Sequence, residues 1–246
     1  MKDNFSTQSA DYSKFRPTYP DALYTWLLSL VPGTEKAWDC GTGNGQVAEK
    51  LACFFDAVAA TDISRQQMDQ AIPNEKIVYS VQSAERTSFP DHSFDLITVA
   101  QAIHWFDFAA FYTEVDRTMK KNGILAVIGY GLMQIEPGLD GIISHLYKEV
   151  VGPFWDAERK YIDENYQTIP FPYKEIAAPA FEMRIEWSFE HLIGYLGTWS
   201  AVKHYKRSHQ VDPVGLVYEG LRKYWGDAEM KVVRFPLLLR VGRGHY

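Results

Sequence analysis

Glycines at alternate positions are the residues of this sequence with the clearest potential to bind a ligand. Gly41, Gly43 and Gly45 follow a short apolar run and precede a segment with helical periodicity. This spacing lets the chain turn tightly and leaves the backbone open to a ligand, while the amide groups that begin the helix face the same ligand. Asp39 lies two residues before the first glycine, where its carboxylate could attract the cationic amino group of an amino-acid-like ligand.

A second carboxylate, Asp62, follows Gly43 by 19 residues and ends the next apolar run. Taken alone, it would be interpreted as a helix cap or a solvated loop residue. At this distance from a glycine turn, an acidic residue can instead accept hydrogen bonds from both hydroxyls of a ribose. A dinucleotide fingerprint requires its third glycine at position 46, which Gln46 occupies. The pattern therefore favours a ribose ligand with an amino-acid portion, and a nicotinamide-dependent oxidoreductase is the alternative.

The elements that must position these residues alternate between apolar runs and helical patterns, which is typical of a parallel α/β sheet. The run Ile124–Ile128 lacks polar alternation, as expected for a strand covered on both faces. Strands are predicted at Lys36–Cys40, Ala57–Asp62, Lys76–Gln82, Phe94–Ala100 and Gly123–Tyr130.

The second half of the chain has a different pattern, with aromatic helical segments punctuated by proline. Helices are predicted over His191–Arg207 and Pro213–Trp225, and strands over Phe181–Phe189 and Val232–Val241. The first of these strands alternates polar with apolar residues, which suits antiparallel pairing at an edge. We expect a single domain, divided into a core at about 30–135, a largely helical cap with the sixth strand at about 136–230, and a final strand at 231–246.

Composition excludes several classes of protein. The 246 residues carry a net charge of −6 without a run of Lys or Arg, which disfavours a nucleic-acid partner held by phosphate contacts. No stretch has the length of a membrane-spanning helix, and the first residues lack the pattern of a signal peptide. The two cysteines, Cys40 and Cys53, lack the number and spacing of a metal site or a disulfide framework. We expect a cytoplasmic protein without a bound metal and without a membrane partner; its oligomeric state cannot be inferred.

The stretch Asp39-Cys40-Gly41-Thr42-Gly43-Asn44-Gly45 resembles the first motif of class I S-adenosylmethionine-dependent methyltransferases. Ser83–Asp91 is similar to the loop that borders the adenine ring in that family, although the family often has Asp where this chain has Ser83. Phe94–Gln101 is similar to the fourth strand, whose end faces the transferred methyl group. The resemblance implies a Rossmann-like α/β fold, with a seven-stranded, mostly parallel sheet, an antiparallel strand and a helical cap.

Four further segments resemble the trans-aconitate methyltransferase-like group within that family. They extend the resemblance over nearly the whole chain, but members of this group need not share one substrate. The segments are Tyr12–Pro20, Ala102–Asp107, Ile169–Pro172 and Gly197–Val202.

The resemblance assigns the cofactor site residue by residue. The glycine turn is expected to hold the methionine portion of S-adenosylmethionine. The acidic residue that ends the second strand is expected to hold the ribose, and the next loop is expected to border the adenine ring. Tyr12 could close the site, because an aromatic face suits a neighbouring sulfonium. The residues expected to bind the cofactor are Asp39, Gly41, Thr42, Gly43, Gly45, Asp62, Ile63, Ser83, Ala84, Glu85, Ala100, Gln101 and Tyr12.

His104 is the candidate catalytic residue, because it follows the strand that ends at the methyl group. It could take a proton from a hydroxyl or an amine, orient a carboxylate that needs no base, or simply pack between Trp105 and the sheet. Arg16 could form paired hydrogen bonds with a substrate carboxylate. The alternative interpretation is that Arg16 is a surface residue without a role in binding. Trp105 and Trp199 complete the expected substrate site.

The sequence thus predicts methyl transfer to a small-molecule acceptor, with a carboxylate among the candidates. A binding protein that keeps the cofactor site without catalysis is the non-enzymatic alternative. A methyltransferase that acts on a macromolecule is a third, and here the acidic balance of the chain disfavours nucleic acid more than it disfavours a peptide.

Overall fold

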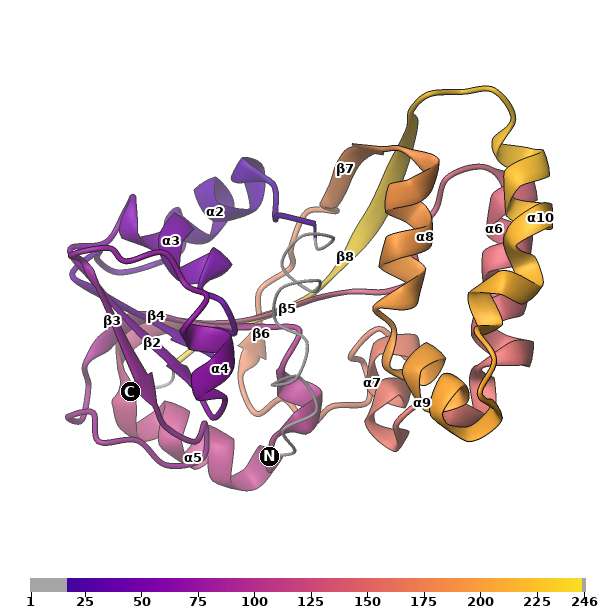
Figure 1. The fold of residues 1–246 in the computed structure, drawn as a ribbon. Coiled ribbons are helices and arrows are strands. Elements are labelled where there is room, and N and C mark those ends of the chain that lie inside the picture. The colour runs from indigo at the N-terminus through magenta and orange to yellow at the C-terminus, as the bar shows by residue number, and fades with distance from the viewer. Residues whose placement is uncertain (1–16, 245–246) are drawn as a thin grey trace.

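A mixed sheet forms the centre of the computed structural model, which describes residues 17–244 (Figure 1). The described residues form eight strands in the order β3-β2-β1-β4-β5-β8-β6, and β7 also pairs with β8. The first five strands pair in parallel: β1 (Lys36–Cys40), β2 (Ala57–Asp62), β3 (Ile77–Val81), β4 (Phe94–Ala100) and β5 (Met119–Tyr130). The last three pair antiparallel: β6 (Lys174–Glu175), β7 (Glu182–Trp187) and β8 (Lys231–Arg243). The Rossmann-like α/β fold is confirmed, with one strand, β6, beyond the seven expected.

Helices cover both faces of the parallel part because successive strand residues point to opposite sides. Ala37, Leu96 and Ile124 pack on one side, and their neighbours in sequence pack on the other. The first side is covered by α2 (Asp21–Leu28) and α3 (Gln46–Ala52), and the second by α5 (Phe108–Thr118). The short helix α4 (Arg65–Met68) follows β2, and its cap is Ser64, whose side chain accepts a hydrogen bond from Gln67 N.

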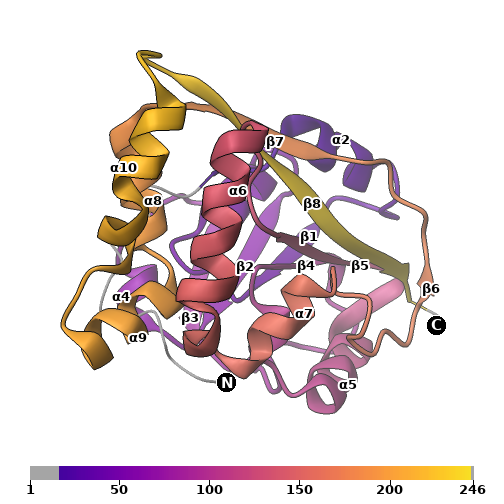
Figure 2. The same cartoon turned by 90° about the vertical axis from the view of Figure 1, so that its right-hand side faces the viewer.

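The helical cap has a hydrophobic core of its own, which joins the sheet through β7 and β8. Strand β8 is continuous: its first half pairs with β7 and its second half with β5, so it runs from the cap into the sheet (Figures 1 and 2). The cap consists of α6 (Pro137–His145), η3 (Leu146–Val150), η4 (Gly152–Phe154), η5 (Ala157–Arg159), α7 (Lys160–Asp163), α8 (Phe189–Gly197), α9 (Ser200–His209) and α10 (Pro213–Trp225). This shared strand supports our proposal that core, cap and final strand form one domain.

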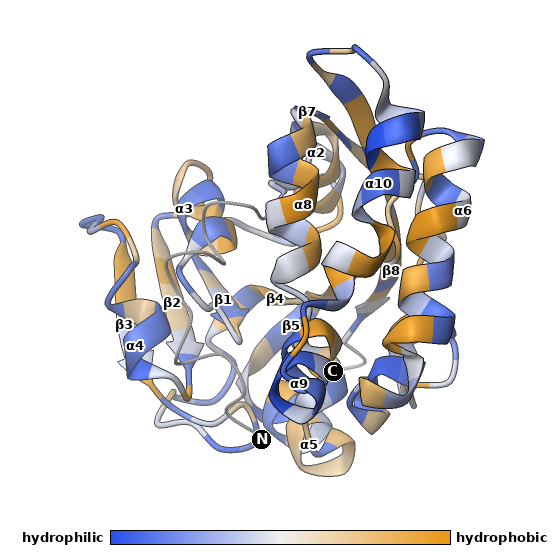
Figure 3. Ribbon diagram, turned by 45° about the vertical axis from the view of Figure 1, so that its right-hand side comes forward, coloured by the Kyte–Doolittle hydropathy of each residue, from blue (hydrophilic) through white to orange (hydrophobic). Residues whose placement is uncertain are grey.

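Helix α10 illustrates how sequence pattern places the cap helices. Val214, Val217, Leu221 and Trp225 are buried at helical spacing, while Leu216 is exposed. In Figure 3, α6, α8 and α10 each combine hydrophobic with hydrophilic stretches, as expected for helices that have one buried face. Within residues 17–244, no helix is long and apolar enough to cross a membrane.

The single helix predicted over His191–Arg207 is wrong in one respect, because the chain breaks between α8 and α9. Thr198 and Trp199 donate their backbone N–H groups to carbonyls three residues back, and Trp199 then takes an extended conformation with ψ 134°. The Thr198 hydroxyl also donates to the Tyr195 carbonyl at 2.6 Å. A side chain that bonds the preceding turn in this way competes with regular helix geometry.

Candidate active site

The three glycines form a turn between β1 and α3 that other residues could not adopt without strain. All three have positive φ, at 71°, 56° and 87° for Gly41, Gly43 and Gly45, a region that favours glycine. A Cβ on Gly41 would lie 2.6 Å from Ala102 Cβ, so the turn also packs tightly against the segment after β4. Among the described residues, a Cβ on Gly43 would meet only Gln67 Oε1, at 4.0 Å. With respect to these residues, the backbone at Gly43 therefore has open space beside it.

Asp62 ties the glycine turn to the end of β2. Its Oδ2 accepts from Gly43 N and its Oδ1 from Ser64 N, both at 2.9 Å. An ionised carboxylate offers about four acceptor positions, so each of its oxygens can accept from more than one donor. The hydrogen bonds from Gly43 N and Ser64 N hold the Asp62 side chain in place beside the glycine turn. Ile63 follows it and is half-buried.

Asp39 lies inside the protein rather than at the surface of the turn. Its side chain is 1% exposed, and its oxygens accept hydrogen bonds from Thr42 Oγ1 at 2.6 Å and Thr98 Oγ1 at 2.8 Å. Burial raises the pKa of the Asp39 carboxyl to about 6, although the two threonine hydroxyls oppose the shift. Asp39 is thus placed to fix the glycine turn through Thr42.

The raised pKa of Asp39 predicts a pH dependence of stability. The folded carboxyl binds a proton more readily than the unfolded one, so this group's contribution to the free energy of unfolding falls as the pH rises from about 4 to about 6. A shift of this size corresponds to about 3 kcal/mol. We expect Asp39→Asn to flatten the pH dependence of urea unfolding in this window relative to the native chain. Identical slopes in both proteins would contradict the assignment.

The loop after β3 is held by its own side chains. The Ser83 hydroxyl donates to the Glu85 carboxylate, and Glu85 Oε1 accepts from Asp107 N at 3.1 Å. Ala84 between them is 1% exposed and packs with the sheet residues beneath. This loop is therefore fixed against the N-terminus of α5.

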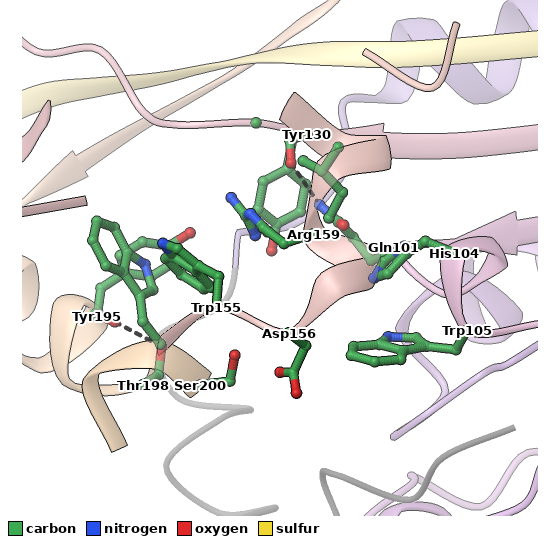
Figure 4. Close-up of a pocket in the computed structure, with 13 residues that line it drawn as sticks. Gln101, His104, Trp105, Tyr130, Trp155, Asp156, Arg159, Tyr195, Thr198 and Ser200 are labelled. Carbon is green, nitrogen blue, oxygen red and sulfur yellow. Dashed lines mark hydrogen bonds between the residues drawn. The ribbon is translucent and has the colours of Figure 1, made fainter. Parts of the chain in front are cut away.

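The end of β4 leads into an open pocket of about 680 Å³, including the space at its mouth. Ala100 is half-buried, and Gln101 follows with φ 54°. Gln101 N donates to Ile128 O and its side-chain amide to Tyr130 O, at 2.8 and 2.9 Å. The pocket is lined by Gln101, His104, Trp105, Tyr130, Gly131, Trp155, Asp156, Arg159, Ile162, Tyr195, Thr198, Trp199 and Ser200 (Figure 4).

His104 is buried at the rim of this pocket and is supported from behind by Tyr166. Its Nδ1 lies 3.3 Å from the Tyr166 hydroxyl, and its ring centroid lies 5.0 Å from that of Trp105. Tyr166 is fully buried and has φ 60°, an unusual value for a residue with a side chain. Arg240 Nη1 donates to the Tyr166 carbonyl at 3.1 Å and also forms an ion pair with Glu175. The imidazole is therefore held by a fixed set of contacts.

Arg159 is a cation that the sequence analysis did not assign to the site. Its guanidinium carbon lies 4.6 Å from the Trp155 ring centroid and 5.2 Å from that of Tyr147. Its Nε donates to the Tyr147 hydroxyl at 2.6 Å, and the Asp163 carboxylate lies 3.8 Å away. Within residues 17–244, these contacts involve the Nε edge and the faces of the guanidinium, which leaves the two terminal nitrogens for a ligand. Figure 4 shows Arg159 on the Gln101 and Tyr130 side of the pocket.

The structure brings three of the predicted substrate residues into one pocket. His104, Trp105 and Trp199 all line the pocket, from the end of β4 and from the break between α8 and α9. Tyr12 and Arg16 lie outside the described residues. Within the part of the chain that is described, no three His, Cys, Asp or Glu residues are arranged to hold a metal ion.

Comparison with known proteins identifies the family. Residues 38–127 match the model of a methyltransferase domain. A Dictyostelium discoideum protein with a methyltransferase name is 33% identical over 245 residues, which covers 96% of this chain and 93% of the relative. A Saccharomyces cerevisiae protein, named as an S-adenosylmethionine-dependent methyltransferase, is 25% identical over 69% of this chain and 60% of its own length.

The fold is shared over nearly the full length of a solved structure described as a type II methyltransferase from Anaeromyxobacter dehalogenans. That chain has a TM-score of 0.88 and 38% sequence identity, with 93% of this chain and 98% of the other covered. Together with the domain match and the full-length relative, it shows that this protein belongs to the class I S-adenosylmethionine-dependent methyltransferases.

Proposed function

We propose that the protein transfers the methyl group of S-adenosylmethionine to a carboxylate of a small-molecule acceptor. The observation that carries this proposal is the Arg159 guanidinium in the pocket beyond β4, stacked on Trp155 with its terminal nitrogens available. Arginine in a fixed orientation is well suited to hold a carboxylate through two parallel hydrogen bonds.

The residues around the glycine turn fit S-adenosylmethionine. Among the described residues, the space beside Gly43 leaves room for the methionine portion against the backbone. Asp62 lies next to this turn, where a carboxylate suits the hydroxyls of a ribose. The loop at Ser83–Glu85 is positioned to border the adenine ring. Because Asp39 is buried and already accepts from two threonines, we propose that it shapes the turn and acts on the amino group of the cofactor only through that turn.

The cofactor supplies a methyl group that its sulfonium already activates. The protein's task is then to align the acceptor with this methyl and to exclude water, and positioning of this kind is worth about 7–11 kcal/mol in favourable cases. The aromatic wall made by Trp105, Trp155 and Trp199 lines the pocket and would displace water as the acceptor binds, and Arg159 orients the acceptor.

His104 has a supporting role if the acceptor is a carboxylate, because no proton has to be removed before methyl transfer. We expect His104→Gln to lower kcat by less than about tenfold, with the same dependence of kcat on pH as the native enzyme. A general base is worth about 10²–10⁴ in rate. A loss of kcat within that range, accompanied by the disappearance of a titration near neutral pH, would make His104 a base and the acceptor a hydroxyl or an amine.

Two finer statements, the subgroup and the location in the cell, are part of the same proposal. We propose that it belongs with the trans-aconitate methyltransferase-like group and that it acts in the cytoplasm, in keeping with two free cysteines. Its partner is then a small molecule rather than a nucleic acid, since the charge of −6 disfavours phosphate binding.

The experiment that tests the proposal compares small carboxylic acids with their amides in the presence of labelled S-adenosylmethionine. We expect base-labile methyl esters from dicarboxylic acids such as succinate and glutarate, and no transfer to the matched diamides. Equal transfer to acids and amides would overturn the carboxylate assignment. Absence of transfer from a protein that still binds the cofactor would favour the non-catalytic alternative, and binding of NADH instead would favour the oxidoreductase.

A further inference from the structure

Asp156 is a second charged residue in the acceptor pocket, and none of its contacts with the described residues gives its side chain a structural role. It occupies the position before the 3₁₀ turn η5, where aspartate commonly caps a helix with its side chain. Here the side chain makes no capping hydrogen bond. Its Oδ2 is buried and, among the described residues, has no hydrogen-bond partner.

A buried carboxylate oxygen without a donor is unfavourable, because the lost hydration is not replaced. The nearby cation does not provide this compensation: the ion pair of Arg159 within the described part of the chain is with Asp163 and not with Asp156. In Figure 4 the two side chains occupy different parts of the pocket, with Arg159 toward Gln101 and Asp156 toward Trp105. The pocket therefore presents one positive and one negative group that do not neutralise each other.

We propose that Asp156 binds an ammonium group of the acceptor, so that the acceptor is a small amino acid-like molecule held by its carboxylate at Arg159 and by its ammonium at Asp156. This inference rests on the proposed function, since it assigns the substrate class of the same pocket. A molecule with both charges can pair with both Arg159 and Asp156, whereas an acid without an amino group leaves the buried Asp156 oxygen without a donor. The aromatic residues that line the pocket suit its hydrocarbon part.

The test uses acids that differ only in an amino group: succinate with aspartate, and glutarate with glutamate. For the native enzyme we expect kcat/KM to be about tenfold or more higher for the amino member of each pair, which is the effect of one charge-assisted hydrogen bond. In Asp156→Asn the two members should differ by less than about threefold, because the amide no longer attracts the ammonium. The exposed Asp227→Asn is the matched control and should keep the native preference.

The outcomes separate this inference from the proposed function. Transfer to the acids without a preference for the amino members, or a preference that Asp156→Asn retains, overturns the role of Asp156 and leaves the carboxylate assignment in place. Absence of transfer to all four acids overturns the carboxylate assignment and the inference together. Calorimetric titration of each variant with S-adenosylhomocysteine confirms that the cofactor site is intact, so that a folding defect is not mistaken for lost recognition.

Discussion

Asp62→Asn is expected to weaken the binding of S-adenosylhomocysteine by about a hundredfold or more. The carboxylate accepts from two backbone N–H groups that define the turn, at Gly43 and Ser64. An amide can accept at one of these positions only and presents a donor to the other. The variant also loses charge-assisted hydrogen bonds to the ribose, which are worth about 1.5–3 kcal/mol each, and the loss of one is close to a tenfold to hundredfold change in affinity.

The measurement is a calorimetric titration of the native chain and the variant with S-adenosylhomocysteine. Asp69→Asn is the matched control, because Asp69 is an exposed acid at the end of the short helix that follows Asp62, and it should bind as the native chain does. NADH should bind to none of the three proteins. If folded Asp62→Asn binds within about threefold of the native chain, Asp62 does not hold the ribose.

Arg159→Gln is expected to lower kcat/KM for the acid acceptor by about a hundredfold, mainly through a higher KM. Removing one partner of a buried charge pair costs about 2–5 kcal/mol, because the other charge is left without compensation. The glutamine keeps a polar side chain beside Tyr147 and Trp155, so we expect these two rings, which Arg159 stacks against, to stay in place.

Arg159→Lys separates charge from geometry at the same position. Lysine keeps the positive charge but cannot form two parallel hydrogen bonds with a carboxylate, so we expect an intermediate loss. The exposed Arg207→Gln is the control and should leave both kinetic constants unchanged. Steady-state kinetics with the best acid acceptor make the comparison. Native kcat/KM in Arg159→Gln would remove the observation on which the proposed function depends.

The core of the fold was predictable because its strands are buried on both faces. Strands β1, β2 and β4 begin and end at the predicted residues, since an apolar run between turn residues leaves little freedom in register. Strand β6 was missed because it has two residues, both exposed, and so carries no hydrophobic pattern. The glycine turn and Asp62 were predictable as neighbours from their spacing, and the structure joins them through the hydrogen bond from Gly43 N to Asp62 Oδ2.

The acceptor side of the site was less predictable, because its residues come from irregular segments. Asp156 precedes a single 3₁₀ turn and Arg159 is its last residue, and so short a turn has no periodicity that could distinguish a pocket residue from a surface one. Thr198 and Trp199 line the pocket at a break within what resembles one helix. Asp39 has the residue type expected of a ligand contact, and only the structure places its oxygens on Thr42 and Thr98.

The most direct test of methyl transfer to a small acid follows the methyl carbon itself. The purified protein would be incubated with S-adenosylmethionine labelled with ¹³C at the methyl group and with each of the four acids, and the label followed by NMR. We predict that the sulfonium methyl signal decays while a methyl ester signal appears, and that both changes are strongly slowed in Arg159→Gln. A sulfonium signal that persists with every acid, or a label that moves to nitrogen or carbon, would contradict the account.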